Sequence, residues 1–230
     1  MASTDTGFGK VRLLDDFIGD SYDTFLWSVP VAGAATAFAI NVQANGVIRG
    51  TVTNNTSSDL ASLVGEIIYR ASAGGPLIFE ARVALQTSLL QFNFIGLTGT
   101  KPSTTVTDIP MNTNGGTFTT GHANAVGFMY TGGTSGAAVW EYAGTKANAD
   151  TALASAPTKY NPVLATFQTL RIVLNPDGAA SFYIDGNLIK ENLASAVTAA
   201  TLLTPAICIT DDGAAASLDV DYCRISCARV

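Results

Sequence analysis

The sequence predicts an all-β protein built as a two-sheet antiparallel β-sandwich. Patterns with the helical period are nearly absent from it. Short runs of β-branched and aromatic residues recur along the chain, and most of them close at Gly, Asn, Asp or Pro. The length of 230 residues suits one large all-β domain with its own core. Short strands at such regular spacing are typical of a sandwich or a barrel.

The first half of the chain contains six predicted strands. The second and third flank an Asn-Gly pair at residues 45–46, which is a strong hairpin signal. In the fifth, apolar residues alternate with Glu80 and Arg82, so one face points to the core and the other to solvent. The six strands cover residues 11–17, 37–42, 47–52, 63–69, 77–85 and 90–95.

The second half adds further predicted strands and two less regular stretches. The strands cover residues 125–130, 137–142, 170–174, 181–184, 188–190, 207–210 and 218–228, with glycine-rich turns between several of them. Residues 98–124 are rich in Thr, Gly, Asn and Pro, and part of residues 146–162 is predicted as a short helix. We therefore expect an N-terminal arm over residues 1–9 and one domain over 10–230, with a long loop insertion around 98–124.

The charge balance excludes several partners. Lys and Arg number 12 against 18 Asp and Glu, which gives a net charge of −6. This balance argues against a nucleic acid or an anionic membrane, because both are bound through clustered basic residues. We find no apolar stretch of the ~20 residues that a membrane helix needs, and no signal peptide at the N-terminus. A surface with so few charges also indicates that much of it is covered in an assembly.

Several segments resemble the concanavalin-A-like jelly-roll family. They are Asp15-Asp16-Phe17 followed by Trp27, the strand at 77–83, the hairpin at 170–186, and the last strand at 216–222, which in that fold pairs back near the first. The resemblance covers roughly residues 10–229 and implies a concanavalin-A-like jelly roll. This version is most similar to the laminin-G-like or lectin-like domains in structural proteins of tailed bacteriophages.

That resemblance implies a structural virion protein, most simply a capsid decoration or cement subunit on the head. It would be made in the host cytoplasm and act through contacts with the major capsid protein or neighbouring subunits. We expect a homo-oligomer, for which a trimer suits decoration sites. Residues 2–10 and the loop at 98–124 are the candidates for these contacts.

The alternative function is a carbohydrate-binding, lectin-like module, exposed on the virion or associated with the tail. Its candidate residues are Trp140 and Tyr142, which share one strand face beside a glycine-rich loop and could stack on sugar rings. Packing of both rings in the core is the competing interpretation.

An enzyme is not expected, and we assign no catalytic residue. Glycoside hydrolysis needs two carboxylates that flank one bond, and the retaining hydrolases of this fold alternate Glu, Asp and Glu on one strand. No such run occurs, and Glu80 with Arg82 is interpreted as a solvated or cross-strand charge pair. The only histidine, His122, has no nucleophile motif nearby and is interpreted as a loop or interface residue.

One metal site is considered. Asp16, Asp219 and Asp221 come from the first and last strands, and such carboxylates suit a structural Ca²⁺ ion. The alternative is that these side chains cap turns or accept backbone hydrogen bonds. We expect no other cofactor. The three cysteines, Cys208, Cys223 and Cys227, are interpreted as small buried hydrophobes.

Overall fold

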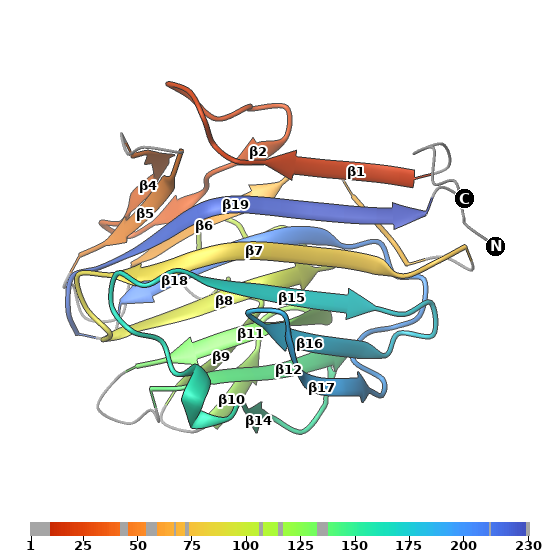
Figure 1. Ribbon diagram of the computed structural model, residues 1–230. Helices are drawn as coiled ribbons and strands as arrows, with labels where there is room; N and C mark the ends of the chain where they lie inside the picture. The colour runs from red at the N-terminus through yellow and green to blue at the C-terminus, as the bar shows by residue number, and fades with distance from the viewer. Residues whose placement is uncertain are drawn as a thin grey trace.

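The computed structural model describes residues 10–41, 46–53, 59–66, 68–71, 74–105, 108–114, 117–132, 138–211 and 213–228. Over these residues the chain forms strands and one short 3-10 turn, and it contains no α-helix (Figure 1). The expected all-β class is therefore confirmed. In the described part of the chain no helix is long and apolar enough to cross a membrane.

The first sheet, called sheet A, has eight strands in the order β17-β16-β15-β7-β19-β5-β4, with β1 also paired to β19. Figure 1 looks onto this sheet and shows β19 between β1 and β7. The pairing of the first strand with the last, which the jelly-roll resemblance implied, is confirmed. Its strands are β1 (Lys10–Asp15), β4 (Thr36–Ile40), β5 (Ile48–Val52), β7 (Leu77–Gln86), β15 (Gln168–Leu174), β16 (Ala180–Ile184), β17 (Asn187–Leu193) and β19 (Ala216–Ala228).

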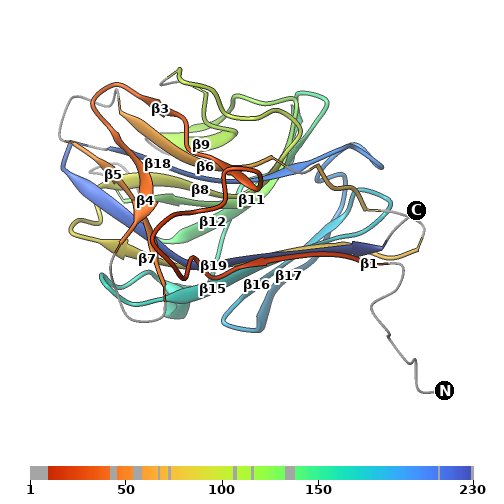
Figure 2. The same cartoon turned by 90° about the horizontal axis from the view of Figure 1, so that it is seen from above.

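The second sheet, called sheet B, has nine strands in the order β13-β12-β11-β8-β18-β6-β2, with β14 on β12 and β3 on β6. Figure 2 shows the two sheets as two layers, which confirms the antiparallel sandwich. Its strands are β2 (Trp27–Ser28), β3 (Val31–Ala32), β6 (Leu60–Gly65), β8 (Gln91–Thr98), β11 (Asn124–Thr131), β12 (Trp140–Lys146), β13 (Ala149–Asp150), β14 (Ala154–Ser155) and β18 (Thr204–Asp211).

The main core lies between the sheets and follows the alternation of the sequence. Phe79 and Val83 of β7 point into it, as predicted, while Arg82 points out. From sheet B, Ile95 and Phe128 meet them. Aromatic edges and faces pack closely there, and such contacts add to the stability gained from burial alone.

Residues 98–124 differ from the irregular loop that was expected. They contain a hairpin formed by β9 (Met111–Asn114) and β10 (Thr117–Thr120). This segment lies on the outer face of sheet B, where Ile109 and Met111 join Phe94 and Met129 in a second buried cluster. The outward positions of β8 and β11 are apolar, so they require a cover. Ile109 and Met111 are thus buried against the same chain.

Two smaller expectations can also be settled. The stretch 146–162 contains β13, β14 and a 3-10 turn over Thr158–Tyr160 in place of a short helix. The hairpins β11–β12 and β15–β16 form as predicted. The arm at 1–9 and the turn residues 43–45 and 133–137 lie outside the described residues.

Candidate functional site

Among the described residues, three cross-strand ion pairs lie on the outer face of sheet A. Asp219 is fully buried, and its carboxylate accepts two hydrogen bonds from Arg49, at 2.5 and 2.7 Å. Arg82 contacts Asp221 at 2.5 Å. The third pair joins Arg171 of β15 to Glu80 of β7, also at 2.5 Å. Strand alternation, interrupted in β19 by a β-bulge between Val220 and Tyr222, puts all six residues on this face, because the other face fills the core.

Glu80 is a second buried carboxylate of this face, on the central strand β7. One of its oxygens accepts from Arg171, and the other accepts from the hydroxyl of Tyr222 at 3.0 Å. Burial raises the pKa of Tyr222, and the charge of Glu80 adds to the effect, so the phenol remains a neutral donor. Arg171 and Tyr222 together hold the Glu80 carboxylate in one orientation.

A cavity of about 380 Å³ opens beside Glu80. We call it the sheet A pocket, and it is lined by Leu14, Asp16, Glu80, Tyr222 and Arg224. The register explains its composition, because Leu14 lies opposite Arg224, and Arg224 lies opposite Glu80. Carboxylates, a guanidinium and a tyrosine ring therefore converge on one small space, as polar groups do in binding sites.

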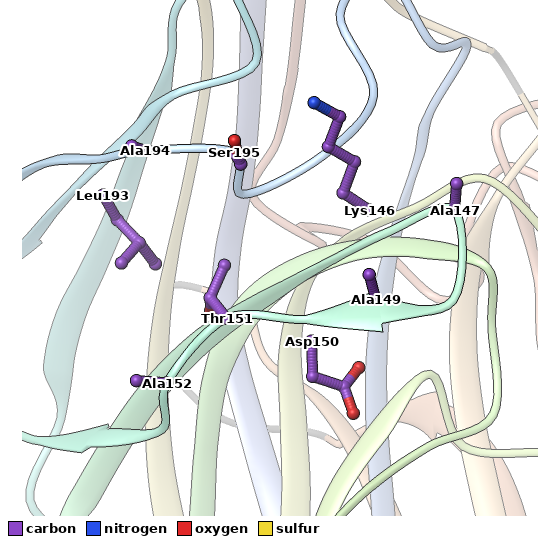
Figure 3. Close-up of a pocket in the computed structure, with 9 residues that line it drawn as sticks. All are labelled: Lys146, Ala147, Ala149, Asp150, Thr151, Ala152, Leu193, Ala194 and Ser195. Atoms are coloured by element: carbon purple, nitrogen blue, oxygen red, sulfur yellow. The ribbon is translucent and has the colours of Figure 1, made fainter.

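A second cavity lies at the edges of both sheets (Figure 3). It measures about 700 Å³ and is lined mainly by small apolar residues around the β12–β13 turn and the end of β17. Figure 3 shows the side chains of Lys146 and Asp150 pointing in opposite directions. The Asp150 carboxylate accepts from Thr145 at 3.1 Å. The described residues that line this cavity include no aromatic side chain, and its two charged side chains point apart, so we favour the sheet A pocket.

The three aspartates of the expected calcium site are not brought together. Asp219 is paired with Arg49 and Asp221 with Arg82, while Asp16 lines the sheet A pocket. Among the described residues, no group of three or more His, Cys, Asp or Glu could hold a metal ion. The physical reason is that an arginine on the neighbouring strand balances each of the two carboxylates on β19.

Trp140 and Tyr142 do not form an exposed sugar-stacking pair. Both lie in the core, with 1% and 7% of their surface exposed. The Trp140 ring nitrogen donates to Gln168 at 2.9 Å, and the Tyr142 ring lies 5.0 Å from that of Phe182. Core packing is therefore the correct interpretation, because the shared strand face of these residues is the inward one.

His122 has a structural role. Its two ring nitrogens contact the Thr98 hydroxyl at 2.6 Å and the Asp108 carboxylate at 2.7 Å. Burial opposes ionisation of Asp108, but hydrogen bonds from Ser103 and His122 outweigh it, so the pKa of Asp108 is lowered. Thr98 and His122 are buried, so the imidazole is enclosed by its own chain. The trio attaches the segment 98–124 to the end of β8.

Sequence reasoning missed Arg171, Tyr222 and Arg224. The signal was present in part, because Tyr222 and Arg224 alternate with buried residues along the last strand. The sequence does not show the strand register. In the structure, Glu80 of β7 lies opposite Arg224 on the neighbouring strand β19 and opposite Arg171 on the other neighbouring strand, β15.

No protein-family model and no curated protein matches the sequence. The fold, however, is shared with solved carbohydrate-active proteins. A β-glucanase from Bacillus licheniformis matches 93% of this chain and 97% of its own, with a TM-score of 0.62 and 12% identity. A Bacteroides ovatus mixed-linkage glucan enzyme of glycoside hydrolase family 16 matches 93% of this chain and 99% of its own, with a TM-score of 0.63 and 12% identity. The carbohydrate recognition domain of Emp46p matches 89% of both chains, with a TM-score of 0.56 and 12% identity.

These similarities confirm the concanavalin-A-like jelly roll. They also correct one expectation. The chain was expected not to be an enzyme, but the structures that share this fold over almost its whole length include a β-glucanase and a glycoside hydrolase family 16 endo-glucanase. The absence of a Glu-Asp-Glu strand motif was too narrow a criterion, since it tests one arrangement of carboxylates only. The matched structures show no link to a phage virion.

Proposed function

We propose that this protein is carbohydrate-active and binds a glycan at the sheet A pocket. The observation that carries the proposal is the convergence of Asp16, Glu80, Tyr222 and Arg224 on one cavity. Its support from outside the chain is that glucanases and a carbohydrate recognition domain share the fold.

The chemistry of the pocket suits a sugar. Hydroxyl groups need both acceptors and donors, which the carboxylates of Asp16 and Glu80 and the guanidinium of Arg224 supply. Leu14, with 66% of its surface exposed, and the Tyr222 ring offer apolar surface to the C–H face of a pyranose. The ion pair with Arg171 pre-orients Glu80, which lowers the entropy lost on binding.

Glycoside hydrolysis at the same pocket is the second candidate. It is favoured by the two carboxylates, Asp16 and Glu80, that line one cavity. Glu80 is held by Arg171 and Tyr222 and suits the role of a fixed nucleophile or charge stabiliser. Asp16 is exposed and suits the role of the proton donor or base.

The test uses the whole protein with neutral and acidic oligosaccharides, including a mixed-linkage β-glucan tetrasaccharide, in titration calorimetry. Asp16→Asn is the informative variant, because its side chain is exposed and the change should leave the fold intact. Asp20→Asn, an exposed position that does not line the pocket, is the matched control. Binding weakened by Asp16→Asn alone supports the site, and no binding of any saccharide refutes the proposal.

Hydrolysis is measured separately as the release of reducing ends. Activity that Asp16→Asn abolishes and Asp20→Asn preserves would establish the pocket as catalytic. Activity that both variants retain would place the chemistry elsewhere.

The role as a virion decoration subunit stays a separate prediction from the sequence, without support from the matched structures. It is compatible with glycan binding, because a virion protein can carry a lectin-like face. Co-sedimentation of the purified protein with phage heads tests it.

A further inference from the structure

A third cavity lies beside the sheet A pocket, along β1 and β19. We call it the basic pocket. It measures about 470 Å³, and Arg224 lines both cavities. Among the described residues that line it, the charged side chains are those of Lys10, Arg12 and Arg224, and all three are cationic. In a chain of net charge −6 with 12 basic residues, this concentration of positive charge is a specific local feature.

The register brings the three cations together. Lys10 and Arg12 are two residues apart on β1, so both point to the outer face of sheet A. Arg12 pairs with Ser226 of β19, and Arg224 lies two residues before Ser226 on the same strand. The edge of the sheet therefore presents the cations side by side.

Arg224 differs from the other arginines at the centre of this face. Arg49, Arg82 and Arg171 each contact a carboxylate on a neighbouring strand. Arg224 is exposed, and within the described residues it forms no ion pair. Its planar guanidinium can offer two parallel N–H groups to one oxyanion.

We propose that the basic pocket binds the anionic group of an acidic saccharide, a uronate carboxylate or a sulfate ester. The neutral part of the same saccharide occupies the sheet A pocket. This inference rests on the proposed function and names its ligand class. The shared lining residue Arg224 makes the two cavities neighbours, so one short ligand can span them.

Charge complementarity distinguishes this ligand from a polyanion. An anion is attracted to Lys10, Arg12 and Arg224, but the next cavity contains the carboxylates of Asp16 and Glu80. A chain with a phosphate on every unit would place negative charge against those carboxylates. A saccharide with one anionic unit beside a neutral unit satisfies both cavities.

The experiment compares ligands of matched length on the full chain by titration calorimetry. The probes are a saccharide with one uronate unit, a sulfated equivalent, a neutral cello-oligosaccharide, and inorganic sulfate and phosphate. We expect an anionic saccharide to bind about tenfold more tightly than the neutral one, as charge-assisted hydrogen bonds allow. This advantage should fall as salt is added, since the site is open to solvent.

The variants locate the effect. Arg224→Ala should lower the affinity for the anionic saccharide much more than the affinity for the neutral one, because the neutral one loses only a single hydrogen-bond donor in the sheet A pocket. Arg224→Lys should restore the lost affinity in part, because the charge returns without the planar fork. Lys190→Ala, an exposed position on β17, changes the net charge equally and should have no effect.

The possible results separate the ligand class inferred here from the proposed glycan binding itself. Equal affinity for neutral and anionic saccharides, weakened to the same extent by Arg224→Ala, overturns this inference and leaves the proposed function standing. No binding of any saccharide overturns both. Inorganic sulfate or phosphate bound as tightly as the anionic saccharide means a simple oxyanion site, and this also overturns the inference.

Discussion

The hairpin of β9 and β10 is either a structural cover of sheet B or a dispensable loop, and Met111→Ala distinguishes the two. Met111 is fully buried and packs in the second cluster with Phe94, Met129 and Ile109. The substitution removes the side chain beyond Cβ from the centre of that cluster. If the hairpin is part of the fold, the variant should lose stability.

The magnitude follows from burial. Moving a methionine side chain out of water stabilises a protein by about 1.5–3 kcal/mol. The cavity left behind adds to the loss, so a buried Met→Ala change costs about 2–5 kcal/mol. For a chain of this size, a loss of about 3 kcal/mol lowers Tm by roughly 6–12 °C.

The assay is denaturant unfolding followed by circular dichroism and checked by calorimetry. Phe25→Ala is the control, because 87% of the Phe25 surface is exposed and its loss should change stability by no more than about 0.5 kcal/mol. A Met111→Ala variant as stable as the wild type would refute the reasoning. The segment 98–124 would then be a loop available for contacts with a neighbour.

Two further predictions concern ionisable groups. The pKa of Asp108 is lowered from 3.8 by its hydrogen bonds in the folded chain. The stabilisation that the ionised Asp108 provides is therefore complete above pH 3.8 and is lost as the pH falls through the lower folded pKa. In Asp108→Asn, the free energy of unfolding should therefore fall less steeply at acid pH than in the wild type. An unchanged acid dependence contradicts this prediction. Burial raises the pKa of the Cys208 thiol to about 12, so it should not react with a disulfide reagent at pH 8 until the protein unfolds. Rapid labelling of the native protein at Cys208 would show that β18 is not buried.

Strand positions and hairpins could be predicted because they depend on local chemistry. The alternation at Phe79 and Val83 fixes which face of β7 is buried, and Asp177-Gly178 requires a tight turn between β15 and β16. The hairpin at Met111 was missed for a physical reason. Its hydrophobic residues are few and separated by Thr and Asn, so only the apolar outer face of β8 and β11 gives them a place to pack.

The candidate site depends on contacts across strands far apart in the chain. The distance in sequence from Glu80 to Tyr222 is 142 residues, and the hydrogen bond between them exists only because β7 pairs with β19. The same holds for Asp219, which was considered as a metal ligand but forms an ion pair with Arg49 of β5. Sequence spacing within one strand carries no information about the partner strand.

By itself, the sequence determined the class of the fold, the core-facing side of the strands and the turns between neighbours, because these follow from side-chain alternation and backbone propensity. Only the tertiary structure decided which charges meet. Sheet order and register placed Arg171 and Tyr222 on Glu80 and left Arg224 between two cavities. A register shift of one residue would turn these side chains to the other face, so the site is a property of strand pairing.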